Sequence, residues 1–270
     1  MSLQFEKWHG IGNDFVLIDG LPDGIAEGDL PELARAVCQR TFGIGADGLL
    51  VALPPVDADA RMAMYNPDGS EAEMCGNGLR CFAMWHHQGR ESAGDYRVET
   101  RAGSLRCQVR GDQVAVEMGV VQILPGPVEI ELDGHRFDSC GVDVGNPHLV
   151  VFCPSHQDVK LEEWGRRLEN HSAFPNRTNV HFVSLEPDGT LRQSTWERGA
   201  GITLACGTGA CASAAAARGH GWCGDSVLIH LPGGDLQIDF EGNLATMTGP
   251  AVRSFTGTWI GRRGAWPDGP

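Results

Sequence analysis

Two cysteines of this 270-residue chain have nearly the same sequence neighbours. Cys75 begins Cys-Gly-Asn-Gly-Leu-Arg-Cys and Cys206 begins Cys-Gly-Thr-Gly-Ala-Cys, and each segment leads into a run typical of a short helix. A thiol at the N-terminus of a helix meets unpaired N–H groups and the positive end of the helix dipole, which stabilise a thiolate. The same N–H groups can bind a carboxylate, and glycine lets the backbone approach the ligand closely.

Two such segments that face each other would place one thiol on each side of a bound anion. A thiolate on one side can remove a proton from the carbon next to a carboxylate. A thiol on the other side can return a proton to that carbon. The segments therefore predict stereoinversion by an acid–base pair of cysteines.

Other roles of cysteine fit these segments less well. A structural zinc site typically contains C-x2-C pairs, whereas the spacings here are C-x5-C and C-x4-C. A redox dithiol would need C-x-x-C. Cys81 and Cys211, the second cysteines of the two segments, fall inside the predicted helices, where a buried small side chain is the simplest role.

The two segments belong to a longer internal repeat. The leading cysteines are 131 residues apart, and two Gly-Asn pairs that end at Asn13 and Asn146 are 133 residues apart. Nine residues before each leading cysteine stands a second polar residue, Asn66 in one half and Glu197 in the other. Several matches at nearly one offset indicate two halves of like topology, which a two-fold arrangement would bring to a shared cleft.

Alternating apolar and polar runs outnumber helical patterns along the whole chain. The runs are separated by Gly, Asp and Pro turns and lack a regular strand–helix alternation, which favours an α+β fold with mainly antiparallel sheet. We expect one domain over residues 1–119 plus 252–270 and a second over residues 120–251.

Composition excludes several classes of partner and cofactor. The net charge of −14 disfavours nucleic acid and anionic membrane surfaces. The absence of a long apolar run or an apolar signal core leads us to expect a cytoplasmic protein with no membrane association. The only lysines, Lys7 and Lys160, are poor candidates for a Schiff base with pyridoxal phosphate. Residues 43–48 match G-x-G-x-x-G, but they precede a strand instead of a helix, so we expect no dinucleotide there.

The chain resembles the diaminopimelate epimerase family over nearly its full length. The motifs stand in the family's order: KWHGIGNDFVLID, TFGIGADG, MYNPDGSEAEMCGNGLRC, GNPHLVVF, FPNRTNV, WERGAGITLACGTGACASAAAA and LPGG followed by MTGPA.

The resemblance implies an amino-acid isomerase that interconverts LL- and meso-diaminopimelate for lysine and peptidoglycan-precursor biosynthesis, without cofactor or metal. It implies two similar domains, each a mainly antiparallel, barrel-like sheet around a central helix, related by a pseudo-two-fold axis. The active site would lie in the cleft between them, and the enzyme would be a homodimer.

The resemblance also implies roles for individual residues. Cys75 and Cys206 would be the base and the acid and would exchange roles with the direction of reaction, assisted by His148 and Glu197 respectively. The carboxylate at the reacting carbon would meet the backbone N–H groups of Gly76, Asn77, Gly207 and Thr208. The rest of the substrate, chiefly its distal amino-acid group, would meet Asn13, Asn66, Asn146, Asn179 and Arg198, with Glu197 also contacting substrate. Arg suits a carboxylate because its fork pairs with both oxygens, and Asn can both donate and accept.

The chain departs from the family pattern at Gly48, where many members have Gln, and at Ile202, where many have Glu. These changes concern substrate preference more than reaction type. One alternative is a related cofactor-independent racemase of another amino acid, such as histidine, which would not need the residues that bind a distal carboxylate. Another is a non-catalytic or isomerase relative on the same fold, although such relatives often lack one or both cysteines.

Overall fold

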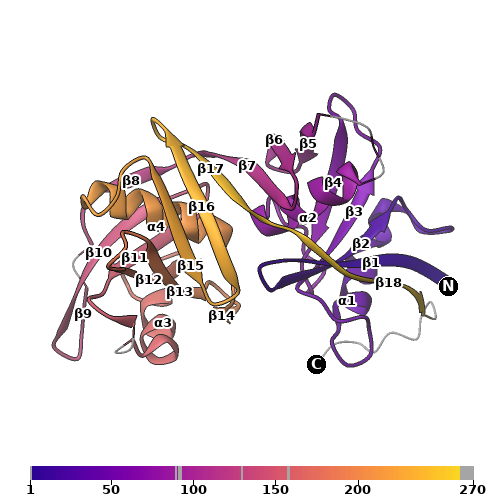
Figure 1. Cartoon of the computed structure of the whole chain (residues 1–270). Helices are drawn as coiled ribbons and strands as arrows, with labels where there is room; N and C mark the ends of the chain where they lie inside the picture. Colours follow the sequence, from indigo (N-terminus) through magenta and orange to yellow (C-terminus); the bar gives the residue numbers. More distant parts are fainter. Residues whose placement is uncertain (1, 89, 91–92, 129, 157–158, 262–270) are drawn as a thin grey trace. The chain divides into compact units, whose positions relative to one another are not determined.

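The structure, a computed structural model, describes residues 2–88, 90, 93–128, 130–156 and 159–261. Contacts between Cα atoms divide the chain into two compact units (Figure 1). Unit 1 comprises residues 1–116 and 250–270, and unit 2 comprises residues 117–249. Residues 262–270 of the predicted first domain lie outside the described residues.

Unit 1 is a run of hydrogen-bonded strands in the order β18-β1-β2-β3-β4-β5-β6-β7. The pairs β2–β3 and β4–β5 are parallel, and the others are antiparallel. The strands are β1 (Ser2–Gly10), β2 (Asn13–Asp19), β3 (Gly48–Leu53), β4 (Ala60–Tyr65), β5 (Asp95–Thr100), β6 (Gly103–Arg110), β7 (Gln113–Val120) and β18 (Val252–Ile260).

Unit 2 repeats this pattern along β10-β11-β12-β13-β15-β16-β17. Here β11–β12 and β13–β15 are the parallel pairs, and β8 and β9 extend the antiparallel edge at β10. The strands are β8 (Gln122–Pro127), β9 (Ile130–Leu132), β10 (His135–Asp143), β11 (Pro147–Phe152), β12 (Asn179–Leu185), β13 (Leu191–Glu197), β14 (Gly201–Thr203), β15 (Ser226–Leu231), β16 (Gly234–Glu241) and β17 (Leu244–Pro250).

The two units therefore share one topology, and the predicted α+β class with two similar, mainly antiparallel halves is confirmed. A helix spans each parallel pair because parallel neighbours need a crossover connection. These helices are α1 (Leu30–Cys38) and α2 (Gly76–His87) in unit 1, and α3 (Leu161–Glu169) and α4 (Gly207–Gly219) in unit 2.

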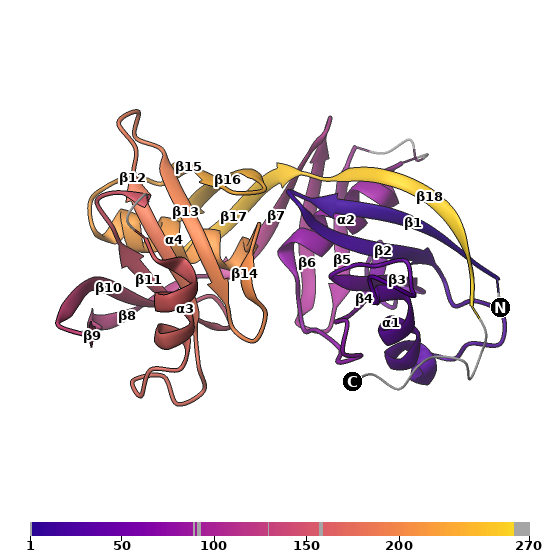
Figure 2. The same ribbon diagram turned by 90° about the horizontal axis from the view of Figure 1, so that it is seen from below.

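Helices α2 and α4 are the central helices of their units (Figures 1 and 2). α2 packs against β1, β2, β4 and β6, and α4 packs against β10, β11, β12 and β16. Small residues allow this enclosure: α4 is GTGACASAAAARG, and its residues from Gly209 to Ala217 are all buried. Each central helix is therefore enclosed by the strands of its own unit.

Helices α1 and α3 cover a second apolar layer in each unit. Leu30, Leu33 and Val37 of α1 are fully buried against Val16 and Leu49. In α3, Leu168 packs into a cluster with Phe182 and Trp196. Within the described residues, no helix has the length and apolar character needed to cross a bilayer.

Candidate active site

Cys75 is the N-cap residue of α2, as the sequence predicts. Its backbone is extended (φ −140°, ψ 110°), and its Sγ accepts a hydrogen bond from the backbone N–H of Gly78 at 3.5 Å. A sulfur that accepts from the first helical turn is held where the N–H groups and the dipole favour negative charge. The Cys75 thiol in turn donates to Oδ1 of Asn13, at an Sγ–Oδ1 distance of 3.9 Å.

Asn13 is oriented by charged groups. Its Nδ2 donates to Oδ2 of Asp47 at 2.8 Å, and its Oδ1 accepts from Nδ2 of Asn77 at 3.1 Å. Arg40 donates to Asp47 at 2.6 Å and to Asp14 at 3.0 Å, and Lys7 forms an ion pair with Asp14. Because Asp47 can only accept, it fixes which end of the Asn13 amide faces Cys75.

The pKa of Asp14 shows how strongly this ion-pair network holds its charges. Burial alone would raise that pKa, but hydrogen bonds from Lys7 and Arg40 outweigh it and hold the pKa below its usual value. The Asp14 carboxylate therefore stays charged at neutral pH. Sequence reasoning missed Asp47, although it stands in the quoted TFGIGADG motif, because nothing local shows that it reaches Asn13.

Asn66 lies in the turn after β4. Its backbone N–H donates to the carbonyl of Ser70 at 2.8 Å, and its Nδ2 donates to Oγ of Ser70 at 3.0 Å. Both bonds are internal to the turn and leave the side chain half-buried. Its predicted contact with substrate remains a prediction.

Cys206 is the N-cap residue of α4 in unit 2, with nearly the same backbone (φ −135°, ψ 107°). Its Sγ lies 3.7 Å from Oγ1 of Thr208, and the residue is only 5% exposed. The segment that follows the cysteine begins the helix at Gly207, just as Gly76 does in unit 1. Cys81 and Cys211 are fully buried, and burial raises the pKa of the Cys81 thiol to about 12.

His148 lies at the start of β11 and is 2% exposed. Its Nε2 is 2.8 Å from Oδ1 of Asn146, and its Nδ1 is 2.8 Å from Nε2 of His181. Burial, with a smaller effect of the Arg198 charge, lowers the pKa of His148 to about 3. Two predicted residues, Asn146 and His148, are thus joined by a hydrogen bond, and a second buried histidine that sequence reasoning missed lies behind them.

The segment with Glu197 and Arg198 is held from two sides. Oδ1 of Asn179 accepts from the backbone N–H of Arg198 at 3.0 Å, so two more predicted residues meet. Glu197 accepts a hydrogen bond from Thr203 at 2.6 Å. The buried carboxylate of Glu169, also missed, accepts from Trp196 at 2.7 Å and from the backbone of Gly199 at 2.9 Å.

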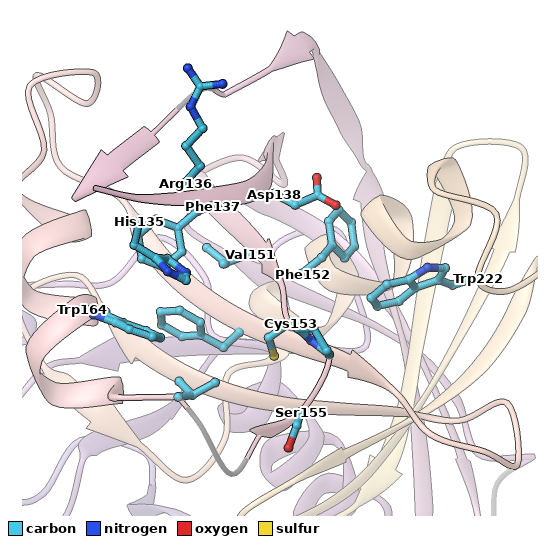
Figure 3. Close-up of a pocket in the computed structure, with 13 residues that line it drawn as sticks. His135, Arg136, Phe137, Asp138, Val151, Phe152, Cys153, Ser155, Trp164 and Trp222 are labelled. Carbon is cyan, nitrogen blue, oxygen red and sulfur yellow. The ribbon is translucent and has the colours of Figure 1, made fainter. Parts of the chain in front are cut away.

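Unit 2 also contains an apolar cavity of about 590 Å³ (Figure 3). His135 and Phe137 of β10 pack on Trp164 of α3, while Phe152 packs on Trp222. None of its 13 lining residues is a predicted site residue. Among the described residues, no cluster of His, Cys, Asp and Glu side chains could hold a metal ion.

Comparison with known proteins assigns the family. The sequence model of diaminopimelate epimerase matches residues 5–124 and 140–254. The diaminopimelate epimerase of Desulfitobacterium hafniense is 46% identical, covering 96% of this chain and 98% of that protein. That of Halothermothrix orenii is 40% identical, covering 98% and 100%.

Solved structures support the fold. A PhzF-family phenazine biosynthesis protein of Bacillus anthracis matches with a TM-score of 0.77 and 15% identity, covering 96% of this chain and 99% of that one. A hydroxyproline epimerase of Agrobacterium vitis matches with a TM-score of 0.73 and 19% identity, covering 96% and 91%. At these identities the structures show a shared fold, whereas the sequence matches show that the chain belongs to the diaminopimelate epimerase family.

Proposed function

We propose that this protein interconverts LL- and meso-diaminopimelate by two-base proton transfer at the α-carbon, without a cofactor. Membership of the family supports the substrate. The observation that carries the mechanism is the pair of cysteines, Cys75 and Cys206, that cap the central helices of two units of like topology. A repeated unit that places a thiol at the same helix end twice supplies two equivalent acid–base groups for one substrate.

In the proposed reaction, the substrate lies between the two domains, with one thiol on each side of the reacting carbon. The thiolate of one cysteine removes the α-proton, so the C–H bond breaks and an S–H bond forms. The thiol of the other cysteine then gives its proton to the opposite side of the carbon and becomes the thiolate. Nothing is oxidised or reduced, and the reverse reaction exchanges the two roles.

The first turns of α2 and α4 stabilise the charge that develops. When the α-proton leaves, negative charge moves onto the adjacent carboxylate. The backbone N–H groups of Gly76, Asn77, Gly207 and Thr208 are our candidates for holding it, because helix N-termini favour anions. His148 and Glu197 would assist Cys75 and Cys206 respectively.

The residues proposed to bind the distal amino-acid group are Asn13, Asn66, Asn146, Asn179 and Arg198, together with Glu197. The hydrogen bond from the backbone N–H of Arg198 to Oδ1 of Asn179 supports a shared role for these two residues, since it fixes the backbone of the residue that carries the guanidinium. Arg198 is exposed and can therefore reach a carboxylate outside the unit's core. We also propose that the protein is a cytoplasmic homodimer in lysine and peptidoglycan-precursor biosynthesis.

The test is proton NMR of LL-diaminopimelate in heavy water with reduced protein, with and without a chelator. We expect the α-proton signal to disappear while the meso isomer forms, at the same rate in both samples. If thiols are shown to be reduced and neither change occurs, the substrate assignment is wrong. Inversion of histidine with diaminopimelate inert would assign the chain to an amino-acid racemase instead.

A further inference from the structure

The buried ring of His148 is one member of a hydrogen-bonded chain that runs through unit 2. From one end, Nε2 of Gln193 donates to Oγ1 of Thr195 at 2.9 Å. Thr195 lies 3.0 Å from Nδ1 of His181, whose Nε2 lies 2.8 Å from Nδ1 of His148. The other end is Oδ1 of Asn146, 2.8 Å from Nε2 of His148.

The two amides at the ends set one direction of donation along the chain. Oδ1 of Asn146 can only accept, so Nε2 of His148 carries a proton and its Nδ1 is an acceptor. Nε2 of His181 must then donate to His148, which leaves Nδ1 of His181 as an acceptor. The Thr195 hydroxyl supplies that proton because Gln193 already donates to its oxygen. Each of these bonds then has one donor and one acceptor with both rings neutral, while Oε1 of Gln193 has no partner among the described residues.

Burial also keeps both rings neutral. It lowers the pKa of His181 well below the usual value, with a smaller effect from the neighbouring His148. His181 and Gln193 are almost completely buried (0% and 1% exposed). Both rings are therefore interior groups that do not contact ions in the solvent.

The internal repeat shows that the hydrogen-bonded His148–His181 pair of unit 2 stands where unit 1 has an apolar contact. In unit 1, Phe15 occupies the β2 position that matches His148, two residues after the Gly-Asn pair. Leu50, the second residue after Gly48 on β3, matches His181, the second residue after Asn179 on β12, because Phe15 pairs with Gly48 and His148 pairs with Asn179. An apolar pair is thus sufficient to build this core, and the histidine pair is an addition specific to unit 2.

The same comparison ties His181 to the cysteine helix. A Cβ placed on Gly78 of α2 would lie 3.2 Å from Leu50 and 3.5 Å from Phe15. A Cβ placed on Gly209, the matching residue of α4, would lie 2.2 Å from Cε1 of His181. Gly209 is three residues after Cys206, so the His181 ring is packed directly against the first turn of the helix that Cys206 caps.

From these contacts we infer that His181 is a positioning residue for the reaction, which donates to Nδ1 of His148 and so holds the His148 proton on Nε2. His148 is then a neutral ring whose Nε2–H donates to Oδ1 of Asn146, so it orients the Asn146 amide toward the substrate without taking a proton from a thiolate. This inference rests on the proposed function for its role in turnover. The tautomer itself does not depend on that function.

Tautomers are read by long-range ¹⁵N–¹H correlation spectra of the whole protein labelled at histidine, with His148→Gln used to assign the signals. We expect His148 and His181 both to be neutral with the proton on Nε2 at pH 7. A proton on Nδ1 of His148, or a charged ring in either residue, overturns the inference. This reading is independent of substrate, so failure of the proposed function would not be confused with it.

Two substitutions test the role in turnover. His181→Leu installs the residue found at the matching position of unit 1, and we expect it to lower kcat about tenfold, the effect of about one hydrogen bond, with KM little changed. His181→Gln can place an amide N–H where Nε2 lies and should restore most of kcat and the Nε2–H signal of His148. His156→Leu, which removes a partly buried histidine bonded to Ser184, is the matched control and should leave kcat unchanged.

The outcomes are distinguishable. If His181→Leu lowers the thermal stability but leaves kcat and the His148 tautomer unchanged, His181 is only a packing residue. If His181→Gln loses as much kcat as His181→Leu while both are folded, the donated hydrogen bond is not what matters. Either result contradicts the inference.

Discussion

The two cysteine-capped helices have the same backbone but different surroundings. Cys75 and Cys206 have φ and ψ values within a few degrees of each other, and each begins a central helix between a parallel pair of strands. Around Cys75, the orienting groups are charged and partly exposed, since Asn13 is held by Asp47 and Arg40. In the unit of Cys206, the polar chain through His148 is neutral and buried.

This difference separates what the duplicated fold supplies from what the side chains supply. The fold supplies two helix N-termini that can each hold a thiol and an anion. The side chains then give the two halves different electrostatics. A two-base epimerase acts on two stereoisomers that differ in shape, so identical halves are not required.

The largest expected effect tests whether Cys75 and Cys206 differ in role from Cys81 and Cys211. Cys75→Ala and Cys206→Ala should each lower the rate of epimerisation by about 10²- to 10⁴-fold, because each removes one acid–base group. Cys81→Ala and Cys211→Ala, at fully buried positions six and five residues further along the two helices, are the matched controls. Full activity in either of the first two variants would remove the proposed pair.

The buried histidines should give unit 2 a pH-dependent stability. The folded pKa of His148 is lowered to about 3 from 6.5, and that of His181 is also lowered, both mainly by burial. Below pH 6.5 the unfolded chain therefore binds more protons than the folded one. The contribution of the buried histidines to the free energy of unfolding is fully present above pH 6.5. It decreases as the pH drops toward 3, by up to about 1.4 kcal/mol per pH unit for each such histidine.

Urea unfolding between pH 7 and pH 5 measures this slope. His181→Leu should reduce it, whereas Val227→Ala, a substitution on strand β15 that removes no titratable group, should keep the wild-type slope. His86 and His156, whose pKa values burial also lowers, contribute equally to all three proteins and cancel in the difference. An unchanged slope in His181→Leu would show that His181 is not buried in the neutral form.

The matched glycines should differ in their tolerance of a methyl group. Gly209→Ala places a Cβ 2.2 Å from the His181 ring, which must move, and should cost about 1–3 kcal/mol of stability. Gly78→Ala meets Leu50 at 3.2 Å and should cost less. The comparison is made by urea unfolding at pH 7. Equal losses would mean that His181 is not packed against α4 as described.

Much of the fold and part of the site could be predicted from the sequence. The alternating runs predicted the α+β class, and the repeated Cys-Gly-x-Gly segments predicted two similar halves, because strand period and helix caps are local signals. Asn146 directly precedes strand β11 and lies two residues before His148, so their contact also follows from local order.

What could not be predicted depends on contacts between distant strands. His181 meets His148 across the parallel β11–β12 pair, 33 residues away, and Asp47 meets Asn13 from 34 residues away. Glu169 supports the Glu197 segment from the end of a helix. Each of these residues has an ordinary local sequence, and only the register of the strands shows its partner.

The measurement that tests the central claim most directly is solvent deuterium exchange in the two single-cysteine variants. Reduced Cys75→Ala and Cys206→Ala are each incubated with LL- and with meso-diaminopimelate in heavy water, and the α-protons are followed by NMR. The account predicts that each variant exchanges the α-proton of one stereoisomer at the reacting centre without forming the other, and that the two variants act on opposite stereoisomers. If both variants exchange the same stereoisomer, or if either still forms the second isomer, the two thiols do not act from opposite sides of the carbon.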